Sequence, residues 1–546
     1  MNVLQDSSFT FKQETDDDSV FELLCRKYLQ HKVIDAQLER QYLDSFDWRL
    51  YRNNLVCGFD RLNSSTHKQH NTQKGIFFVV DKKTGASICE FPVNRIPRFS
   101  DDITQQTCRK LLNELLGIRA LITVASSAVK RRQLNILNQE NKTILILRTE
   151  SYTLTEQTDK HHYFSRLTVS PVKGYRKTFK QVRQYLIDQL KLPIAGKAMF
   201  DEILAASNKI PGPGVFTACQ TLNDTHNTGE AVRILLHQFL EVMQANEPGL
   251  RDAIDTEFLH DYRVAVRRTR TLLGQIKHIF PAKQLDYFKR EFLWLGQITG
   301  PTRDLDIYLL KFDDYRQELP KGMQNHLAPF QEFLERHWQI EHTLIRRKLD
   351  SKRYQKLIDK LHHILEDKDS SAQYTRLKRI APQDTVNATK PARIVAGKIL
   401  WKLYKQVLKE GKAITPQSPD EDLHELRKSC KKFRYLIEFF QDYYPSKSIK
   451  MLLKLLKALQ DNLGDFQDLC IQTTQLNHFA EQMQQEGLAN TQTLMAMGVL
   501  VEKLNVRKMS TRAEFEHRFN AFTQPDSKEP FSDLFKPQHQ PKGIMI

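Results

Sequence analysis

The sequence predicts an α+β protein in two parts: an N-terminal domain built on an antiparallel sheet, then an all-α region of two repeated helical bundles. Apolar and polar residues alternate in the first part, as in strands, and recur with a period of 3.6 from Glu230 onward, as in long helices. An internal repeat supports the second assignment. His260, Arg263, Arg267 and Arg270 return as His424, Arg427, Lys431 and Arg434, each 164 positions later (424 − 260 = 164). We therefore expect two copies of one helical unit.

The strand pattern is clearest in two runs separated by a turn. GIFFVVD at residues 75–81 and ASICEFPV at residues 86–93 flank Lys82-Lys83-Thr84-Gly85, which predicts a β-hairpin. Further strand-like runs cover residues 120–129, 142–154 and 163–172, and helical runs cover residues 105–116 and 178–190.

Proline and glycine mark the boundary between the two parts. The run Ile210-Pro211-Gly212-Pro213-Gly214 interrupts both helix and sheet hydrogen bonding. We therefore expect an N-terminal domain over 1–205, a linker over 206–225 and a helical domain over 226–525. The repeat halves fall at about 226–365 and 391–525, joined by a polar stretch at 367–390, and residues 526–546 are expected to form a mobile tail.

The charge balance favours polyanionic partners. The 546 residues include 82 Lys and Arg against 65 Asp and Glu, which gives a net charge of +17 and a pI near 9.3. Such an excess favours phosphate polymers, nucleic acid or an anionic membrane surface, and charge alone does not choose among them.

Cysteine usage and hydropathy indicate the compartment. The seven cysteines are scattered and form no Cys-x-x-Cys pair, so neither a disulfide framework nor a zinc site is predicted, and a reducing interior fits best. The first residues lack the features of a signal peptide, and no run approaches the roughly 20 apolar residues of a membrane span. We expect a cytoplasmic protein with no membrane span.

The repeated segment places its cations on one side of a helix. At 100° per residue, the four positions of each copy fall within roughly 80° of arc. Leu259, Tyr262 and Val266 fill the neighbouring sector in the first copy, so the basic stripe borders the core instead of opposing it. Pairing with acids of other helices is one interpretation. The alternative, which two matched copies favour, is a groove that binds a chain of phosphates.

Other residues extend or flank these stripes. Arg290, Arg303, Lys454 and Lys457 are candidates to lengthen the basic track. Gly300 and Gly464 each fit a helix end followed by a new helix N-terminus. Asp304 and Asp468 follow these glycines at matched positions, where we expect them to cap a helix and orient arginines.

HDYRVAVRRTR at 260–270 and HELRKSCKKFR at 424–434 resemble the CHAD family, the conserved histidine α-helical domain, over roughly residues 225–520. The resemblance implies two helical bundles related by an approximate twofold, with a shared basic surface that binds inorganic polyphosphate. It carries over to His260, Arg263, Arg267, Arg270, His424, Arg427, Lys431 and Arg434. Gln467 stands where the first copy has Arg303, so the halves are not expected to bind equally.

The N-terminal domain resembles the CYTH fold, the antiparallel tunnel of triphosphatases and adenylyl cyclases, through QYLDSFDWRLYRNNL at 41–55. That family carries an N-terminal Glu-x-Glu-x-Lys strand whose carboxylates hold a divalent metal. This chain has Ser8 and Thr10 in place of the carboxylates and keeps only Lys12, so the resemblance implies a lost metal site. The basic residues that remain to bind phosphate without cleaving it include Lys130, Arg131, Arg132, Arg148 and Arg166. An ordinary solvated run of charge is the other interpretation of Lys130-Arg131-Arg132.

These observations favour a non-enzymatic protein that binds inorganic polyphosphate, with no catalytic residue, metal or cofactor. Other polyanions are further candidate partners, and association with polyphosphate granules is expected within the cytoplasm. One alternative is a metal-dependent tripolyphosphatase that recruits acids such as Glu14, Glu90 or Glu150. Another is a nucleic-acid-binding protein, because a sugar-phosphate backbone attracts the same cations.

Overall fold

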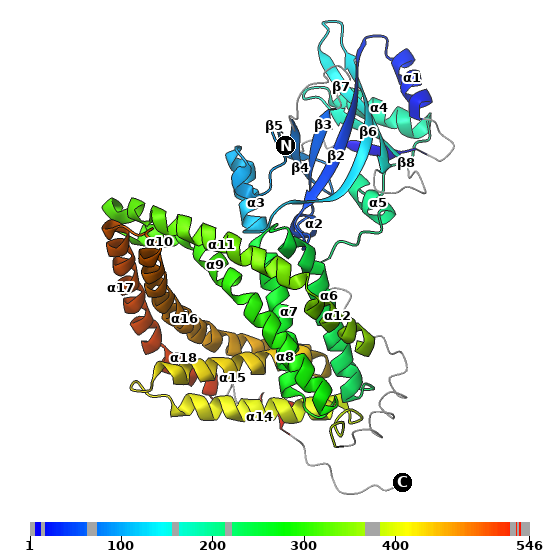
Figure 1. Cartoon of the computed structure of the whole chain (residues 1–546). Coiled ribbons are helices and arrows are strands. Elements are labelled where there is room, and N and C mark those ends of the chain that lie inside the picture. The colour runs from blue at the N-terminus through cyan, green and yellow to red at the C-terminus, as the bar shows by residue number, and fades with distance from the viewer. Residues whose placement is uncertain are drawn as a thin grey trace, which may run out of the picture. The chain divides into compact units, whose positions relative to one another are not determined.

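The structure, a computed structural model, describes residues 6–11, 17–62, 74–154, 163–212, 221–365, 383–524, 531 and 534–536. The chain divides into two compact units, Met1–Thr217 and Ala218–Ile546. The first is an α+β unit around one antiparallel sheet and the second is helical (Figure 1), as the sequence predicts.

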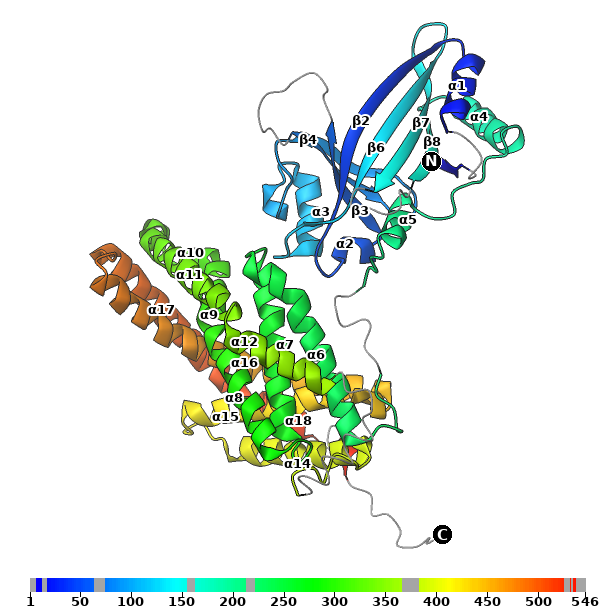
Figure 2. The same cartoon turned by 45° about the vertical axis from the view of Figure 1, so that its right-hand side comes forward.

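One eight-stranded sheet forms the N-terminal unit, in the order β1-β8-β7-β6-β2-β3-β4-β5, and every neighbouring pair is antiparallel (Figure 2). The strands are β1 (Ser7–Thr10), β2 (His31–Asp44), β3 (Leu55–Leu62), β4 (Gly75–Asp81), β5 (Ser87–Val93), β6 (Ile122–Leu137), β7 (Thr143–Leu154) and β8 (Tyr163–Pro171). The predicted hairpin is confirmed as β4 and β5.

The sequence patterns missed three strands, β1, β2 and β3, and shortened a fourth, β6. The first half of β2 is exposed or half-buried on both faces, so its residues do not alternate, and β3 contains a buried run from Leu55 to Asp60. Strand β6 continues beyond residue 129 because Lys130 and Arg132 point to one face while Arg131 points to the other. Ion pairs on both faces keep this charged stretch in the sheet.

Short helices cover parts of the sheet: α1 (Asp17–Lys27), α2 (Arg49–Arg52), α3 (Gln106–Leu116), α4 (Arg176–Asp188) and α5 (Met199–Ala206). Helices α3 and α4 bury one apolar side each, as their spacing predicts. Cys89 on β5 and Cys108 on α3 form a disulfide, so the expectation that the cysteines stay reduced does not hold for this pair.

The helical unit contains two series of helices. The first comprises α6 (Thr228–Arg251), α7 (Thr256–Gln275), α8 (Ala282–Ile298), α9 (Gly300–Leu310), α10 (Phe312–Glu318), the 3-10 turn Lys321–Leu327, α11 (Ala328–Leu349) and α12 (Lys352–Leu365). The second comprises α14 (Ala392–Ala413), α15 (Asp420–Phe439), α16 (Ser446–Gln485), α17 (Thr491–Ala513) and α18 (Phe515–Thr523).

The repeat of the sequence is also a repeat of helix boundaries. Helix α15 begins and ends 164 residues after α7, and α16 begins 164 residues after α8. Helix α17 ends 164 residues after α11. The helical region is therefore built almost entirely from two copies of one structural unit.

The two copies differ after their third helix. In the first copy a bend at Thr299 separates α8 from α9, and Pro301, which lacks an N–H group, lies in the first turn of α9. In the second copy Asp465 replaces this proline, and α16 runs through Gly464 as one helix of 40 residues. The predicted helix end at Gly464 is therefore wrong.

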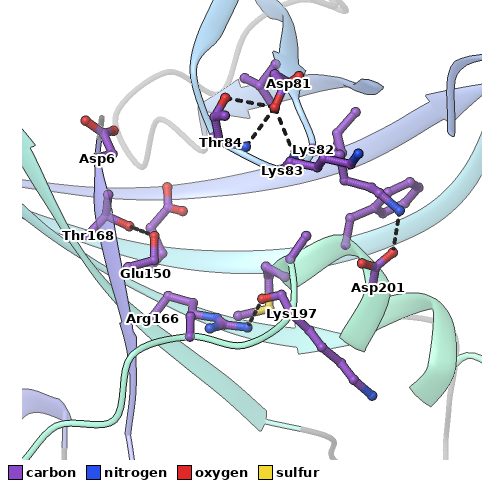
Figure 3. A pocket seen from close by; sticks show the side chains of 18 of the residues that line it. Asp6, Asp81, Lys82, Lys83, Thr84, Glu150, Arg166, Thr168, Lys197 and Asp201 are labelled. Atoms are coloured by element: carbon purple, nitrogen blue, oxygen red, sulfur yellow. Dashed lines mark hydrogen bonds and ion pairs between the residues drawn. The ribbon is translucent and has the colours of Figure 1, made fainter. Parts of the chain in front are cut away.

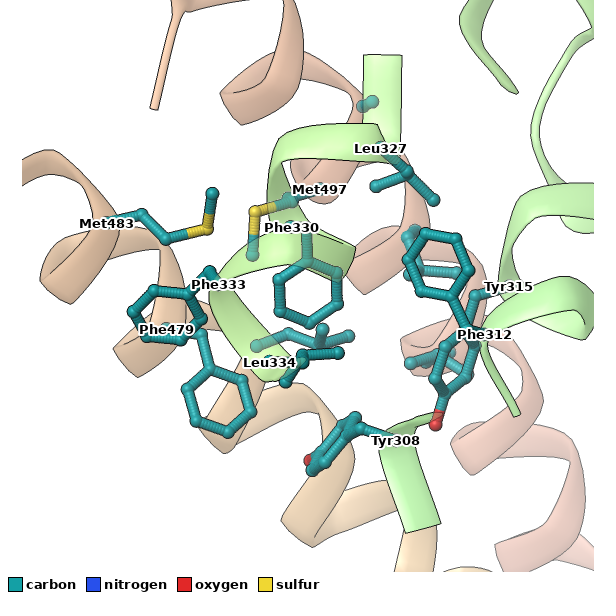
Figure 4. Close-up of a cluster of buried hydrophobic side chains, with 14 of the residues drawn as sticks. Tyr308, Phe312, Tyr315, Leu327, Phe330, Phe333, Leu334, Phe479, Met483 and Met497 are labelled. Carbon is teal, nitrogen blue, oxygen red and sulfur yellow. The ribbon is translucent and has the colours of Figure 1, made fainter. Parts of the chain in front are cut away.

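A shared apolar core joins the two copies (Figure 4). Tyr308, Phe330 and Phe333 of the first copy pack with Phe479 and Met483 of the second, and all five are at least nine-tenths buried. Adjacent aromatic rings lie 5.2 to 5.9 Å apart, centre to centre. The helical unit therefore folds around contacts between the halves, which fixes the position of one half against the other.

Two stretches expected to be irregular contain ordered residues. Phe531 and Phe535, in the tail expected to be mobile, are buried, and Phe531 stacks on Tyr404 at 4.6 Å. Residues 383–389 form turns, with Ala388 and Lys390 accepting hydrogen bonds from the start of α6. Within the described ranges, no helix is long and apolar enough to cross a membrane.

Candidate functional site

The basic stripes lie on α7 and α15, the two helices that match end to end. Leu259, Tyr262 and Val266 of α7 are buried, as are Leu423 and Leu426 of α15, so each stripe borders the core as predicted. Burial of these neighbours holds each helix in one rotation about its axis. The cations of the stripe therefore have fixed positions, which a freely solvated helix face would not give them.

Arg263 is anchored to the end of α8. Its Nη1 donates to the carbonyl of Gly296 at 3.0 Å and to Oγ1 of Thr299 at 2.8 Å. Burial lowers the pKa of Arg263, Arg267 lowers it further, and Asp304 opposes this shift. The charged guanidinium is thus held in a place where neighbouring cations destabilise it.

The equivalent arginine of the second copy is anchored to α16. Nη2 of Arg427 donates to Oδ1 of Asp468 at 3.1 Å. Nδ1 of His424 lies 2.6 Å from Oε1 of Gln467. Asp304 and Asp468 occupy matched positions, and each interacts with the arginine of its own copy. Asp468 bonds to its arginine, whereas Asp304 acts on Arg263 electrostatically. The predicted capping role is wrong, because Asp304 lies within α9 and Asp468 within α16.

The two stripes meet at Arg267. Its Nε donates to the hydroxyl of Tyr435 on α15 at 2.7 Å, and the next residue, Arg268, donates to Glu438 at 2.7 Å. Arg267 lies close enough to lower the pKa of Arg263 on its own helix and of Arg427 on α15. We call the surface formed by Arg263, Arg267, Arg270, Arg427, Lys431 and Arg434 the basic surface.

Lys431 is a partly buried cation among other cations of the basic surface. Its pKa is lowered to about 8, chiefly by burial and also by Arg427 and Arg267, while Asp468 acts in the opposite direction. Burial also lowers the pKa of Arg270. Neither side chain makes a hydrogen bond or ion pair with any residue that the structure describes. Both can therefore receive an anionic ligand without losing an existing partner.

A second concentration of charge lies in the N-terminal unit, around a cavity of about 750 Å³. Arg40 donates from Nε and Nη2 to the two oxygens of Asp60, each at 2.7 Å. Arg131 donates to Glu150 at 2.7 Å and to Asp60 at 3.0 Å. Burial alone would raise the pKa of Glu150, but Arg40 and Arg131 hold it well below its usual range.

Arg166 is the buried cation of this cavity with unused donors. Its side chain is 5% exposed, and its Nη2 contacts the carbonyl of Lys197 at 2.8 Å and Glu202 at 2.9 Å (Figure 3). Within the described part of the chain, its Nε and Nη1 have no hydrogen-bond partner. Lys82 and Asp201 form a further ion pair at 3.3 Å.

The structure separates the predicted cations of this unit. Arg131, Arg148 and Arg166 line the cavity, whereas Lys130 and Arg132 pair with Asp18 on the opposite face of the sheet. Ser8, Glu90 and Glu150 also line the cavity. Oγ1 of Thr10 instead contacts the carbonyl of Pro193 at 3.4 Å. Lys12 and Glu14 lie outside the described residues.

Two carboxylates of the cavity, Asp60 and Glu150, are committed to arginines. Among the described residues, no three His, Cys, Asp or Glu side chains are placed to hold a metal ion. Asp60 and Glu150 are each bonded to Arg40 and Arg131, so their negative charge is already balanced. A hard cation needs carboxylate oxygens that are not committed in this way.

Comparison with known proteins identifies the helical unit. The sequence profile of the CHAD domain matches residues 234–477, which include both basic helices. These residues form a CHAD domain. No curated protein matches the chain in a sequence comparison.

Solved structures give further similarities. The CHAD domain from the plant Ricinus communis is 25% identical, with a TM-score of 0.45, over 56% of this chain and 95% of that one. PptA from Streptomyces chartreusis is 13% identical, with a TM-score of 0.42, over 54% of this chain and 99% of that one. The Hippeastrum protein HpAC1, for which a dominant triphosphatase activity is described, is 9% identical, with a TM-score of 0.27, over 38% of this chain and 96% of that one.

Of the other predicted cations, two are paired with acids and two are exposed. Arg290 is 65% exposed and bonded to Glu291 at 3.0 Å. Arg303 donates to the carbonyl of Thr256 at 3.1 Å and lies 3.7 Å from Glu257. Lys454 and Lys457 are exposed on α16. The contacts of Arg290 and Arg303 give these two residues structural roles.

The stripe pattern missed the residues that join the halves of the CHAD domain. Tyr435, Glu438 and Arg268 link α7 to α15, yet none belongs to the basic stripes. Tyr435 and Glu438 stand at the repeat positions of Thr271 and Gly274. A comparison of the two copies for unmatched polar residues would have indicated them.

Proposed function

We propose that this protein binds inorganic polyphosphate on the basic surface of its CHAD domain. The observation that carries the proposal is the position of Lys431, which is partly buried near Arg427 and Arg267 and forms no ion pair or hydrogen bond in the described part of the chain. A folded protein keeps such repulsion when a ligand relieves it. A chain of phosphates supplies closely spaced negative charges that match several fixed cations at once.

The surroundings of Tyr435 favour polyphosphate over single-stranded nucleic acid. Proteins that bind single strands commonly offer an aromatic ring on which a base stacks. Tyr435 lies on the basic surface, but its ring is stacked on Phe439 at 6.3 Å, and Arg267 and Arg268 lie 5.7 and 5.8 Å from its centre. Protein groups therefore already lie around this ring, where a stacked base would have to be placed.

Competition binding to the full chain tests the proposal. Labelled long-chain polyphosphate would be displaced by unlabelled polyphosphate, single-stranded nucleic acid or duplex nucleic acid at equal phosphate concentration and several salt concentrations. We expect polyphosphate to compete best at physiological salt. Equal or better competition by nucleic acid would overturn the proposal in favour of a nucleic-acid-binding protein.

The N-terminal cavity supports a second candidate function, binding of a short phosphate chain. The buried Nε and Nη1 of Arg166 favour this function, since an anion would provide the acceptors that these donors lack. Binding is favoured over cleavage because Asp60 and Glu150 are committed to arginines. Phosphate release from tripolyphosphate that requires added Mg²⁺ or Mn²⁺, and that Arg166→Gln abolishes, would instead establish the tripolyphosphatase alternative.

Location follows from the ligand. We infer a cytoplasmic protein that associates with polyphosphate granules. Imaging of a tagged full-length chain with a polyphosphate stain tests this, and a uniform distribution in cells rich in granules would contradict it.

A further inference from the structure

Glu438 is a carboxylate placed between cations of both halves of the CHAD domain. It accepts a hydrogen bond from Nη2 of Arg268 on α7 at 2.7 Å and from Nε of Arg434 on α15 at 2.8 Å. Its side chain is 17% exposed. Nη1 of Arg434 also donates to Oε1 of Gln460 at 3.4 Å. The basic surface thus contains one acid at the end where Arg434 lies.

The first copy has no equivalent of this arrangement. Arg270 matches Arg434 in the repeat, whereas Gly274 stands at the position of Glu438 and Gly296 at the position of Gln460. Two side chains that hold Arg434 are therefore replaced by glycines, which have none. In the described residues Arg270 has no hydrogen bond or ion pair. Arg270 and Arg434 therefore occupy matched positions of the repeat but have surroundings that differ in charge.

We propose, on the basis of the polyphosphate binding proposed above, that Glu438 is an internal counter-ion that closes the Arg434 end of the basic surface to phosphate chains. A bound chain then contacts Lys431, Arg267 and Arg270 and is excluded from Arg434 and Arg268. A phosphate at Arg434 would have to displace the carboxylate from two guanidinium groups or lie beside it, and two like charges at such a distance repel strongly. Glu438 therefore limits how many phosphates the surface binds.

The substitution Glu438→Gln tests this directly, because glutamine keeps an acceptor for the arginines and removes the charge. We expect the affinity of the full chain for long-chain polyphosphate to rise about five- to tenfold at low salt, and the slope of log K against log salt to steepen by roughly one to two. The control is Glu425→Gln, which removes the same charge from the exposed side of α15, where Glu425 pairs with Lys428. That variant should stay within about twofold of the wild type.

A double substitution identifies which residue causes the increase in polyphosphate affinity. Adding Arg434→Gln to Glu438→Gln should remove much of the increase, because the proposal assigns it to the released Arg434 and Arg268 and only Arg268 then remains. In the otherwise wild-type chain, Arg270→Gln should weaken binding about fivefold and Arg434→Gln no more than about twofold. This second comparison keeps the proposal testable if Glu438→Gln unfolds.

The outcomes distinguish failure of the proposed role of Glu438 from failure of the proposed polyphosphate binding. If the wild type shows no salt-dependent binding of polyphosphate, the proposed function fails. If the wild type binds but Glu438→Gln matches Glu425→Gln, or binds more weakly while circular dichroism shows it folded, the role of Glu438 is refuted. Equal losses from Arg270→Gln and Arg434→Gln would also refute it.

Discussion

The N-terminal cavity and the basic surface of the CHAD domain both concentrate arginine, yet they treat its charge in opposite ways. In the cavity, Arg40 and Arg131 are bonded to Asp60 and Glu150, and the pKa of Arg40 is raised well above its usual value. On the basic surface, burial and neighbouring cations lower the pKa of Lys431. The number of cations in a region therefore says little about its function. Cations that the fold pairs with acids have a structural role. Cations without such counter-ions are candidates to bind an anionic ligand.

The largest expected effect concerns the N-terminal cavity, where acids balance the charge of the arginines. Glu150→Gln leaves Arg40 and Arg131 buried with a reduced negative partner, so we expect the free energy of unfolding of the N-terminal unit to fall by about 3–5 kcal/mol. Urea denaturation would measure the loss. Glu140→Gln is the control, since Glu140 is exposed and pairs with the exposed Lys142, and it should change stability by less than about 0.5 kcal/mol. A matching small effect for Glu150→Gln would show that the cavity charges are not a structural network.

A smaller effect concerns the pH dependence of polyphosphate binding by the basic surface. The pKa of Lys431 is lowered to about 8 in the free protein, and only the protonated amine attracts phosphate. Affinity for polyphosphate should therefore fall several-fold as the pH rises from about 7 to about 9. Lys431→Arg should remove most of this fall because guanidinium stays charged throughout this range.

Two controls make that titration specific. Long chains are used because their internal phosphates keep a constant charge over this range. Lys454→Arg, which changes an exposed lysine of α16, should keep the wild-type pH dependence. A wild type whose affinity does not change between these pH values would mean that Lys431 does not contact the ligand.

The smallest expected effect concerns the contact between the halves. Tyr435→Phe removes the acceptor that holds Nε of Arg267, and we expect polyphosphate affinity to fall about two- to fivefold, in line with the loss of one hydrogen bond to a charged group. Tyr404→Phe serves as a control because the hydroxyl of Tyr404 is buried with no hydrogen-bond partner in the described residues. Equal affinities of the two variants would show that the position of Arg267 does not depend on Tyr435.

The sequence predicted features that repeat locally and missed those that depend on contacts between distant segments. The match between α7 and α15 follows from the constant offset between His260 and His424. Each copy also shows helical periodicity within its own short segment, which a sequence reveals directly. The continuous α16 depends on the absence of a proline after Gly464. The glycine alone predicted a helix end at this position. The Arg267–Tyr435 bond joins residues 168 positions apart and has no local pattern.

The same distinction applies to the cavity. The cations of β6 and β8 were recognised, but their partners were not, because Asp60 lies on a strand that no alternation predicted. The sequence therefore identified which residues carry charge. It did not show which of those charges the fold neutralises.

The most direct test of polyphosphate binding by the basic surface is the salt dependence of affinity for two variants with the same net charge. One carries Arg263→Gln, Arg267→Gln, Arg427→Gln and Lys431→Gln. The other carries Arg176→Gln, Lys177→Gln, Lys180→Gln and Lys191→Gln, exposed cations of the N-terminal unit. The first should lose roughly 100-fold in affinity at low salt and flatten the slope by roughly three, with helicity retained, while the second should remain near the wild type. Equal losses from both variants would contradict the account, because binding would then follow net charge and not the basic surface.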